Sequence, residues 1–301
     1  MADVERALGR AVKQFWAVRA SQQARQGGTS GVKDAGNRSA VTGGKHADGF
    51  VELIAKIVRD AGLPGASVHT NSKARRTLPG YFRPSKEWDV LVVHGDDLVA
   101  AVEVKSQVGS FGNNFNNRVE EALGNATDFW AAYAQGAYRP SARPWLGYLF
   151  MLEESPTSLC ATRRIELAPY PVDEAFQTLS YARRYEQTCQ RLVRERLYDA
   201  ACFFTSNAEE GKKGKFSEPS AELGIRNFAV SLAARAASFA AMAAASGKPI
   251  WMGRVSSPST ARSTITGARV SSSMTSPKTW TSTDMGTPGR LGPFHSNAPQ
   301  R

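Results

Sequence analysis

The chain is poor in the residues that build disulfide frameworks, metal–thiolate sites and nucleophile–histidine sites. Its 301 residues include only three cysteines and four histidines. Cys160, Cys189 and Cys202 lack any short paired spacing, so the sequence indicates neither a disulfide framework nor a zinc site. Thiols of this kind are typical of a reducing compartment. No Ser/His/Asp or Cys/His pattern supports covalent nucleophilic catalysis.

Long hydrophobic runs are also missing. No apolar run reaches the length of a membrane span, and the first ten residues, MADVERALGR, carry acids where a signal peptide has its apolar region. We therefore expect a cytoplasmic protein. The net charge is +11 with a pI near 9.8, which favours a polyanionic partner. From Ser246 onward seven Lys or Arg against one Asp contribute +6, so the rest of the chain carries only +5.

One stretch, Trp88 to Gln107, combines two apolar runs rich in Val and Leu with three charged residues. A glycine and aspartates separate the runs, which is a hairpin signal. If the loop is Gly95 to Asp97, the antiparallel register pairs His94 with Leu98. That register decides which charged side chains face each other.

The same register places two carboxylates, Asp89 and Glu103, opposite each other, and Lys105 shares a face with Glu103. Opposed carboxylates repel, and they are tolerated best with a cation between them. Mg²⁺ fits, because it binds one or two carboxylates together with phosphate oxygens, and the Val104 carbonyl offers a further ligand. Such an ion would polarise a phosphodiester and activate water, while Lys105 would orient the nucleophile and stabilise the developing charge.

Aspartate, thirteen residues, and then Glu-x-Lys resembles the PD-(D/E)xK nuclease motif, with Trp88 in place of the proline. A solvated hairpin edge with the same letters is common, so this motif alone is weak. The following sequence, SQVGSFGNNFNNRVEEALGNATDFWAAY from Ser106 to Tyr133, adds to it. Together with DAGNRSAVTGGKHADGF at Asp34 to Phe50, it resembles the XhoI family of type II restriction endonucleases. The resemblance runs from about Gly31 to about Ala245.

This resemblance implies cleavage of double-stranded DNA within a palindromic six-base site, 5′-CTCGAG, by a homodimer whose genetic partner is a cognate DNA methyltransferase. A palindrome suits a two-fold protein in which each subunit reads one half-site. The expected fold is α/β, with a restriction-endonuclease-like core in which a mixed β-sheet carries the catalytic hairpin and has helices on both faces.

Periodicity predicts the elements around the hairpin. Spacings of three and four indicate helices, and short continuous apolar runs indicate buried strands. The predicted helices are His46 to Ala61, Val119 to Tyr133, about Ser180 to Tyr198, and Ala221 to Ala245; the predicted strands are Trp145 to Leu152 and Ala200 to Thr205.

The polar segment Gly109 to Asn117, GSFGNNFNN, is a candidate for DNA contact. Asn113, Asn114 and Asn116 could read adenine edges, and Arg118 could read guanine or hold a phosphate. The alternative is a turn in which Asn117 caps the next helix with Glu120 as its reciprocal partner. Both interpretations are compatible, with Asn117 as the cap and the other amides on the functional side.

Other basic residues allow two interpretations. Arg75 and Arg76, with Lys73 and Arg83, flank a Leu-Pro-Gly turn followed by aromatics and could contact phosphates, or they could form a solvated loop. Lys212, Lys213 and Lys215 lie in a predicted loop with the same two possibilities. Arg183 and Arg184 lie near acids, which favours an exposed ion-paired face. A supporting acid on the first core helix would be Glu52, but the helical wheel places it on the solvent side.

Helical spacing near the start, the extent of the family resemblance, and a change of composition near the end divide the chain into three expected parts. Residues 1–30 form an N-terminal helical extension, residues 31–245 the PD-(D/E)xK endonuclease domain, and residues 246–301 a Ser/Thr-rich basic tail that is expected to be disordered. The tail is either an unrelated or out-of-frame extension, or a basic arm that adds nonspecific DNA affinity. Two alternatives to a restriction enzyme remain open: a structure-selective DNA nuclease of the same fold, and a catalytically inactive DNA-binding protein.

Overall fold

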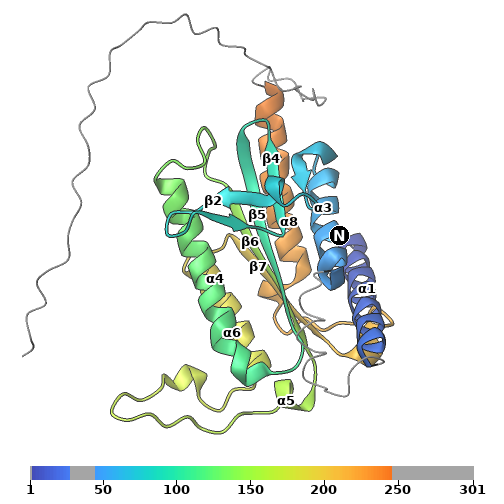
Figure 1. The fold of residues 1–301 in the computed structure, drawn as a ribbon, viewed down its shortest axis with the longest axis vertical. Coiled ribbons are helices and arrows are strands. Elements are labelled where there is room, and N and C mark those ends of the chain that lie inside the picture. Colours follow the sequence, from blue (N-terminus) through green and yellow to red (C-terminus); the bar gives the residue numbers. More distant parts are fainter. Residues whose placement is uncertain (1, 28–44, 246–301) are drawn as a thin grey trace, which may run out of the picture. The chain divides into compact units, whose positions relative to one another are not determined.

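The computed structural model describes residues 2–27 and 45–245. The predicted loop at residues 34–44 and the predicted disorder of the tail at residues 246–301 lie outside the described residues. In the described part, the elements follow the order of Figure 1, beginning with α1 (Ala2–Gly27) and the short helix η1 (Lys45–Ala47) and ending with α8 (Ile225–Ala245).

A five-stranded sheet forms the centre of the fold, in the order β1-β4-β5-β6-β7. Its strands are β1 (Val68–His69), β4 (Val90–His94), β5 (Asp97–Gln107), β6 (Trp145–Glu153) and β7 (Ala200–Ser206). The strand β4 runs antiparallel to β1 and β5, whereas β5, β6 and β7 run parallel to one another. The predicted mixed sheet is therefore confirmed, and β5 is the strand at which the pairing changes from antiparallel to parallel.

One face of the sheet is covered by α1, α3 (Asp48–Asp60) and α8 (Figure 1). Alternate residues of β5, such as Val102 and Val104, share a core with the apolar sides of these helices. The helix α8 has the length and composition of a membrane span, with a mean hydropathy of 1.5. The sequence interpretation did not expect a segment of this kind. Part of the helix packs in this core, through Ile225, Phe228, Ala229, Leu232, Ala236, Phe239 and Ala243.

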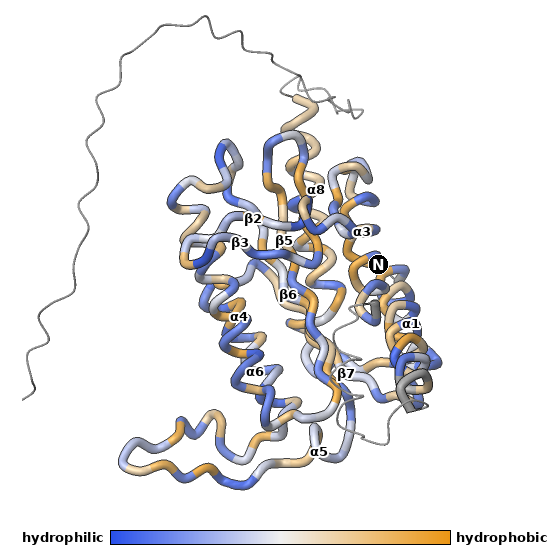
Figure 2. The backbone as a smooth tube through the Cα atoms, viewed as in Figure 1, coloured by the Kyte–Doolittle hydropathy of each residue, from blue (hydrophilic) through white to orange (hydrophobic). Residues whose placement is uncertain are grey.

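The opposite face is covered by α4 (Phe111–Ala134) and α6 (Tyr181–Arg194) (Figure 1). Figure 2 shows hydrophilic and hydrophobic residues alternating along both helices, as expected of helices with one buried side. Ala101, Tyr148 and Phe203 extend from the strands into this second core. Helices on both faces were predicted, and the structure confirms them.

The hairpin reaches its predicted pairing by a different route. The turn has two residues, Gly95 and Asp96, so His94 pairs with Asp97 and the predicted pairing of His94 with Leu98 is wrong. A bulge beside Val92 then shifts the register by one residue, and Val90 pairs with Val102. Continued by one residue beyond the start of β4, this register leads to Asp89 and Glu103, the two residues that were predicted to face each other.

The helix α4 begins earlier than expected. Its N-cap is Ser110, so the GSFGNNFNN segment is the first two turns of the helix and not a loop capped by Asn117. Phe111 is buried in the second core and fixes this start. Gly109 has φ 68°, a conformation that suits glycine and turns the chain from β5 into the helix.

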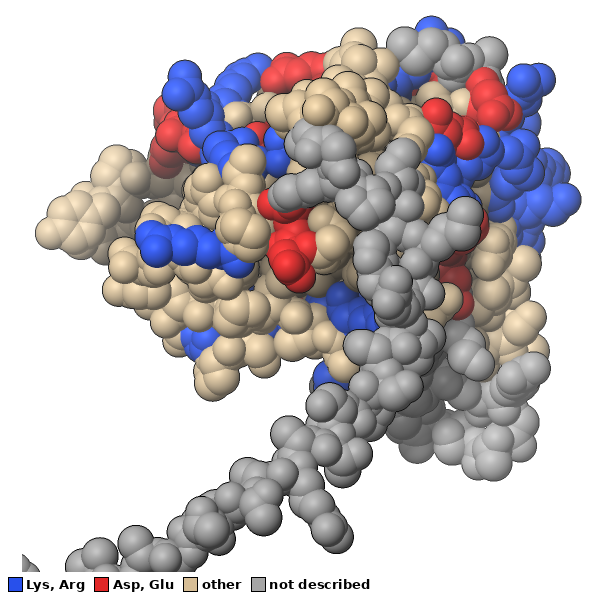
Figure 3. Space-filling view, turned by 90° about the horizontal axis from the view of Figure 1, so that it is seen from above, with Lys and Arg blue, Asp and Glu red and all other residues tan. Residues whose placement is uncertain are grey.

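Smaller elements complete the described part. The basic segment around residues 71–83, which was predicted as a loop, contains the short helix η3 (Ala74–Arg76) and one strand of a two-stranded sheet. The sheet pairs β2 (Thr77–Pro79) with β3 (Ser85–Glu87). The remaining short helices are η2 (Gly65–Ser67), α5 (Pro156–Leu159), η4 (Glu174–Phe176), α7 (Ala208–Gly211) and η5 (Ala221–Leu223). Figure 3 shows Lys and Arg interspersed with Asp and Glu on one end of the molecule.

Candidate active site

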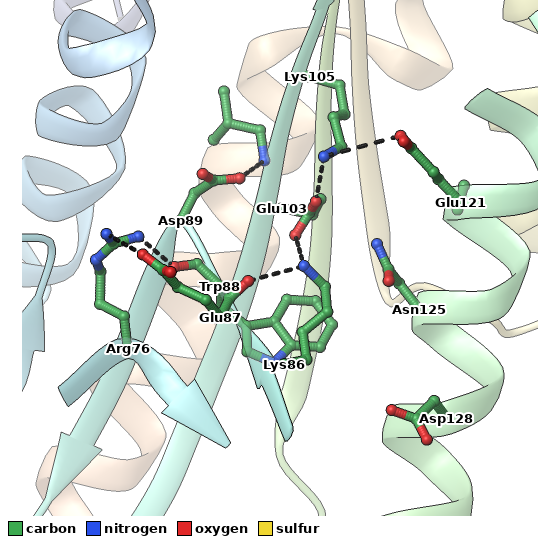
Figure 4. Close-up of polar contacts among 12 residues, drawn as sticks. Arg76, Lys86, Glu87, Trp88, Asp89, Glu103, Lys105, Glu121, Asn125 and Asp128 are labelled. Atoms are coloured by element: carbon green, nitrogen blue, oxygen red, sulfur yellow. Dashed lines mark hydrogen bonds and ion pairs between the residues drawn. The ribbon is translucent and has the colours of Figure 1, made fainter. Parts of the chain in front are cut away.

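Charged side chains from β3 and β5 converge beside the hairpin, on the side of the sheet that faces α4 (Figure 4). Both oxygens of the Glu103 carboxylate form ion pairs. One lies 2.6 Å from Lys105 Nζ, and the other lies 2.8 Å from Lys86 Nζ. Lys105 also lies 3.9 Å from Glu121 of α4. The predicted proximity of Glu103 and Lys105 is therefore present, together with a second lysine that the sequence interpretation did not include.

Glu103 is held ionised by these two lysines. It is 1% exposed, and burial alone would raise the pKa of its carboxyl group. Lys105 and then Lys86 outweigh burial, so the pKa of Glu103 is lowered. Burial opposes the charge on Lys105 as well, but Glu103 raises the pKa of that ammonium group above its ordinary value. Glu103 and Lys105 therefore stabilise each other's charged form.

The pKa of Asp89 is shifted in the opposite direction to that of Glu103. In the described part of the chain it accepts one hydrogen bond, from the Val104 N–H to Oδ2 at 2.7 Å. Burial, followed by the charge of Glu103, raises the pKa of Asp89 to about 6. Lys105 and Lys86 lower it only in part. Asp89 is thus a half-buried carboxylate that a further cation would stabilise.

The donor set around Asp89 fits a hard divalent cation. A strand residue directs its N–H and C=O to the same side, so the Val104 carbonyl points to the edge where its N–H meets Asp89. Asp89, Glu103 and this carbonyl supply oxygen ligands, which Mg²⁺ prefers. Across the described residues there is no group of three His, Cys, Asp or Glu that could hold a metal. The remaining ligands would come from water and substrate oxygens.

A cleft of about 590 Å³ opens beside Asp89 and Lys105. It lies between the C-terminal part of α1 with η1 on one side and the N-terminal part of α4 on the other. Its polar lining comes from several elements that are distant in the sequence: Arg19, His46, Asp89, Lys105, Ser106, Gln107, Ser110, Asn113, Asn114 and Arg118. A substrate in this cleft would contact the hairpin and both helices.

The predicted DNA contacts on α4 divide between two positions. Asn113, Asn114 and Arg118 line the cleft, whereas Asn116 is exposed and does not belong to its lining. Arg118 forms an ion pair with Glu121 at 2.6 Å. Three of the four predicted side chains are therefore in reach of a ligand that enters the cleft.

Arg75 and Arg76 lie on the short helix η3, away from the cleft lining. Arg76 is held within the protein, because its guanidinium donates to the Trp88 carbonyl and to Glu87, both at 2.6 Å. Arg75 is exposed.

The structure also locates the remaining charged candidates. Glu52 is on the exposed side of α3 and pairs with Arg59, as the helical wheel predicted. Arg183 is largely exposed and pairs with Glu186 at 2.6 Å, as predicted. The prediction is wrong for Arg184, which is buried, donates to Thr162 Oγ1 at 2.5 Å and packs against the Tyr181 ring. The other pairs are Lys213 with Glu210, Lys215 with Glu210, and Lys73 with Glu87.

Three site residues have no signal in the sequence. Lys86 is the middle residue of β3, a three-residue strand (Ser-Lys-Glu) with no apolar residue that would mark it as a strand. Arg19 lies in a helix that was interpreted as an extension, and His46 begins the predicted core helix. Only the packing of α1 and β3 beside the hairpin brings them together with Asp89 and Lys105.

Comparisons with known proteins agree with one another. The family described as "Restriction endonuclease XhoI" matches residues 24–218. The type II restriction enzyme BstVI of Geobacillus stearothermophilus is 44% identical over 220 residues, which are 71% of this chain and 97% of that protein. The type II restriction enzyme XhoI of Xanthomonas vasicola is 44% identical over 195 residues, 64% of this chain and 77% of that protein. The type II restriction enzyme AbrI of Azospirillum brasilense is 47% identical over 171 residues, 56% of this chain and 75% of that protein. No solved structure matches.

Proposed function

The chain belongs to the XhoI restriction endonuclease family, and we propose that it cuts DNA with the residues that converge beside its hairpin. It is a type II, site-specific deoxyribonuclease. The observation that supports this assignment is that Asp89 and Lys105 line one cleft, while Lys105 pairs with the buried Glu103 and Asp89 accepts the N–H of Val104, the residue between them on β5.

Each residue has a distinct role in the proposed hydrolysis. Asp89, Glu103 and the Val104 carbonyl would hold Mg²⁺, which supplies charge stabilisation and activation of water when bound. Lys105 is placed to orient the attacking water and to stabilise charge that develops on the phosphate. Lys86 holds the second oxygen of Glu103 and so fixes the orientation of that carboxylate. No covalent intermediate with the protein is required.

Recognition is proposed to come mainly from the α4 side of the cleft. Asn113 and Asn114 line it beside Arg118, and amides and guanidinium groups are the side chains that read adenine and guanine edges. Asn116, Arg75 and Arg76 remain proposed DNA contacts outside the cleft lining.

The finer properties are proposals that rest on the resemblance to the family. We propose that a homodimer cleaves the palindrome 5′-CTCGAG, that each subunit reads one half-site, and that a cognate methyltransferase protects host DNA. Localisation in the cytoplasm, where that DNA is, belongs to the same proposal.

A digestion experiment tests this function. Purified full-length protein is incubated with plasmid DNA and Mg²⁺, and the cut ends are sequenced. Glu103→Gln keeps the shape of the side chain but removes the charge, and a chelator removes the metal. Glu52→Gln is the matched control, because it removes one exposed acid far from the cleft.

We expect discrete ends at one palindrome for the wild type and for Glu52→Gln, and no cutting in the other two reactions. Cutting at many sites that share a DNA structure would support the structure-selective nuclease instead. DNA binding by the wild type without cutting in any metal would support the inactive DNA-binding protein.

A further inference from the structure

The cleft wall formed by α1 and η1 contains buried polar atoms that lack partners. Arg19 Nε and His46 Nδ1 are buried, and neither has a hydrogen-bond partner among the described residues. Gln22 Oε1, about one helical turn from Arg19 but outside the cleft lining, is also unpartnered. Arg118 Nε on the α4 side is a fourth such atom. Buried polar atoms are nearly always satisfied in folded proteins, so a cluster of exceptions along one cleft points to a ligand.

Arg19 is the most unusual of these residues. It is 4% exposed, yet it forms no ion pair with any described residue. The acid that most affects its pKa is Glu153, which lies outside ion-pair distance and already accepts the Gly109 N–H at 2.9 Å. Isolated buried charges are strongly unfavourable, and arginine retains its proton under all ordinary conditions. Among the described residues, the positive charge of Arg19 in the cleft wall therefore has no compensating anion within ion-pair distance.

The sequence of α1 explains how Arg19 comes to be there. Leu8, Val12 and Phe15 follow helical spacing and are fully buried. Arg19 is four residues beyond Phe15, so it continues the same stripe, which leaves the core and enters the cleft. Basic residues that only keep a helix soluble lie on its exposed side, as Arg6 and Arg10 do on the side of α1 opposite Arg19.

His46 supports this arrangement from the neighbouring element. Its ring packs edge-on against Phe15 at a centroid distance of 5.3 Å, and it is 8% exposed. Burial and the charge of Arg19 lower the pKa of His46, so the ring is neutral at pH 7. A neutral imidazole can donate one hydrogen bond and accept another, and it adds no repulsion next to the guanidinium group.

We propose that the Arg19 guanidinium binds a phosphate group of the DNA backbone in the cleft, with His46 as a hydrogen-bonding neighbour. The planar fork of arginine matches two phosphate oxygens, and the unpartnered Nε–H is one of its donors. The strand would be held from the α1 side by Arg19 and from the α4 side by Arg118. This inference rests on the proposed function, and Arg19 lies before residue 24, where the family match begins.

The test compares Arg19→Gln and Arg19→Lys with Arg10→Gln. All three are made in the full chain, and Arg10→Gln is the matched control because it removes an exposed charge from the same helix. The probe is a fluorescent duplex that contains the sequence cut by the wild type. Binding is measured by anisotropy in chelator at several salt concentrations, and single-turnover cleavage is measured in Mg²⁺.

Loss of a charge-assisted contact should weaken binding about 10- to 100-fold in Arg19→Gln. The slope of log affinity against log salt concentration should become shallower by about one, which corresponds to the loss of one phosphate contact. Arg19→Lys should recover part of the affinity, and Arg10→Gln should stay within about twofold of the wild type. The melting temperature of Arg19→Gln should not fall, since the replaced charge has no ion-pair partner among the described residues.

Two results would overturn the inference. One is a wild type that binds and cuts DNA while Arg19→Gln does so equally well with an unchanged salt dependence. The other is a fall in melting temperature that accounts for the whole loss of binding, because Arg19 would then serve the fold. Failure of the proposed function is a separate result, in which the wild type itself neither binds the duplex nor cuts it.

Discussion

Two aspartates lie near α4 in contrasting surroundings. Asp128 is 5% exposed and accepts the N–H groups of Tyr81 and Phe82 at 2.8 and 2.7 Å, and Arg83 Nε at 2.8 Å. Burial would raise the pKa of Asp128, but these donors together lower it. Asp89 accepts a single N–H in the described part of the chain, and its pKa is raised to about 6.

This contrast separates a structural carboxylate from one that is kept for a ligand. Asp128 has its negative charge balanced by the protein itself, and the result is a fixed loop at the tip of the β2–β3 sheet. Asp89 has lone pairs that no other described residue engages. The same distinction applies to cations, since Arg83 pairs with Asp128 and donates to Asn125, whereas Arg19 forms no ion pair with any described residue.

The largest expected effect is on cleavage by Asp89→Asn. The amide can still accept the Val104 N–H, but it cannot supply a charged metal ligand. We expect the single-turnover cleavage rate to fall by at least about 10³-fold, while the free energy of unfolding at pH 7 does not fall. Rate measurements with saturating protein, together with urea unfolding, check both parts. A variant that cuts at the wild-type rate would remove Asp89 from the active site.

The reverse pattern is expected for Asp128→Asn. An asparagine cannot balance the Arg83 charge, and we expect a loss of about 2–4 kcal/mol in the free energy of unfolding. Cleavage by the folded fraction, measured well below the melting temperature, should stay within a few fold of the wild type. Asp60→Asn, which affects only an exposed ion pair with Lys56, is the control and should cost less than about 1 kcal/mol. Equal losses in the two variants would mean that the Asp128 contacts contribute no more than a surface pair.

These two aspartates also show what the sequence could predict. Asp89, Glu103 and Lys105 are related by strand alternation and one hairpin, which are local, so their convergence was predictable. The predicted turn was wrong by one residue, and the bulge beside Val92 restored the pairing. Bulges have no strong sequence signal, so this agreement depended on a compensation that sequence reasoning did not include.

The contacts that the sequence did not predict are all non-local. The hydrogen bonds of Asp128 join residues more than forty positions apart. Lys86 reaches Glu103 only because the β2–β3 sheet packs beside the hairpin. The start of α4 was misplaced because amides and glycines dominate the segment, whereas one buried side chain, Phe111, extends the helix to Ser110. Tertiary burial overrode local propensity there.

A smaller effect is expected in the pH dependence of stability. The pKa of Asp89 is 3.8 in an unperturbed chain and about 6 in the folded protein. Between these values the folded state binds more protons than the unfolded state, so stability falls as pH rises through this window. With a discount for partial exposure, we expect the wild type to lose about 1–3 kcal/mol relative to Asp89→Asn between pH 4 and pH 6. Urea unfolding of both proteins across this range measures the difference. If the free energy of unfolding changes with pH in the same way in both proteins, the charge of Asp89 is already compensated in the free protein.

The smallest effect follows from the same uncompensated charge and concerns magnesium. A cation that binds only the folded state stabilises it by RT ln(1 + [Mg²⁺]/Kd), which is about 1 kcal/mol when the ion is at several times its Kd. The melting temperature of the wild type should therefore rise when Mg²⁺ is added in the absence of DNA. The rise should disappear in Asp89→Asn. It should persist in Asp128→Asn, because in the wild type the Asp128 carboxylate already contacts Arg83 and two N–H groups and is not expected to bind the ion. Equal rises in all three proteins would indicate general ion binding at the surface. Mg²⁺ would then bind at Asp89 only together with DNA phosphates. The raised pKa of Asp89 would reflect its burial and would not indicate a metal site in the free protein.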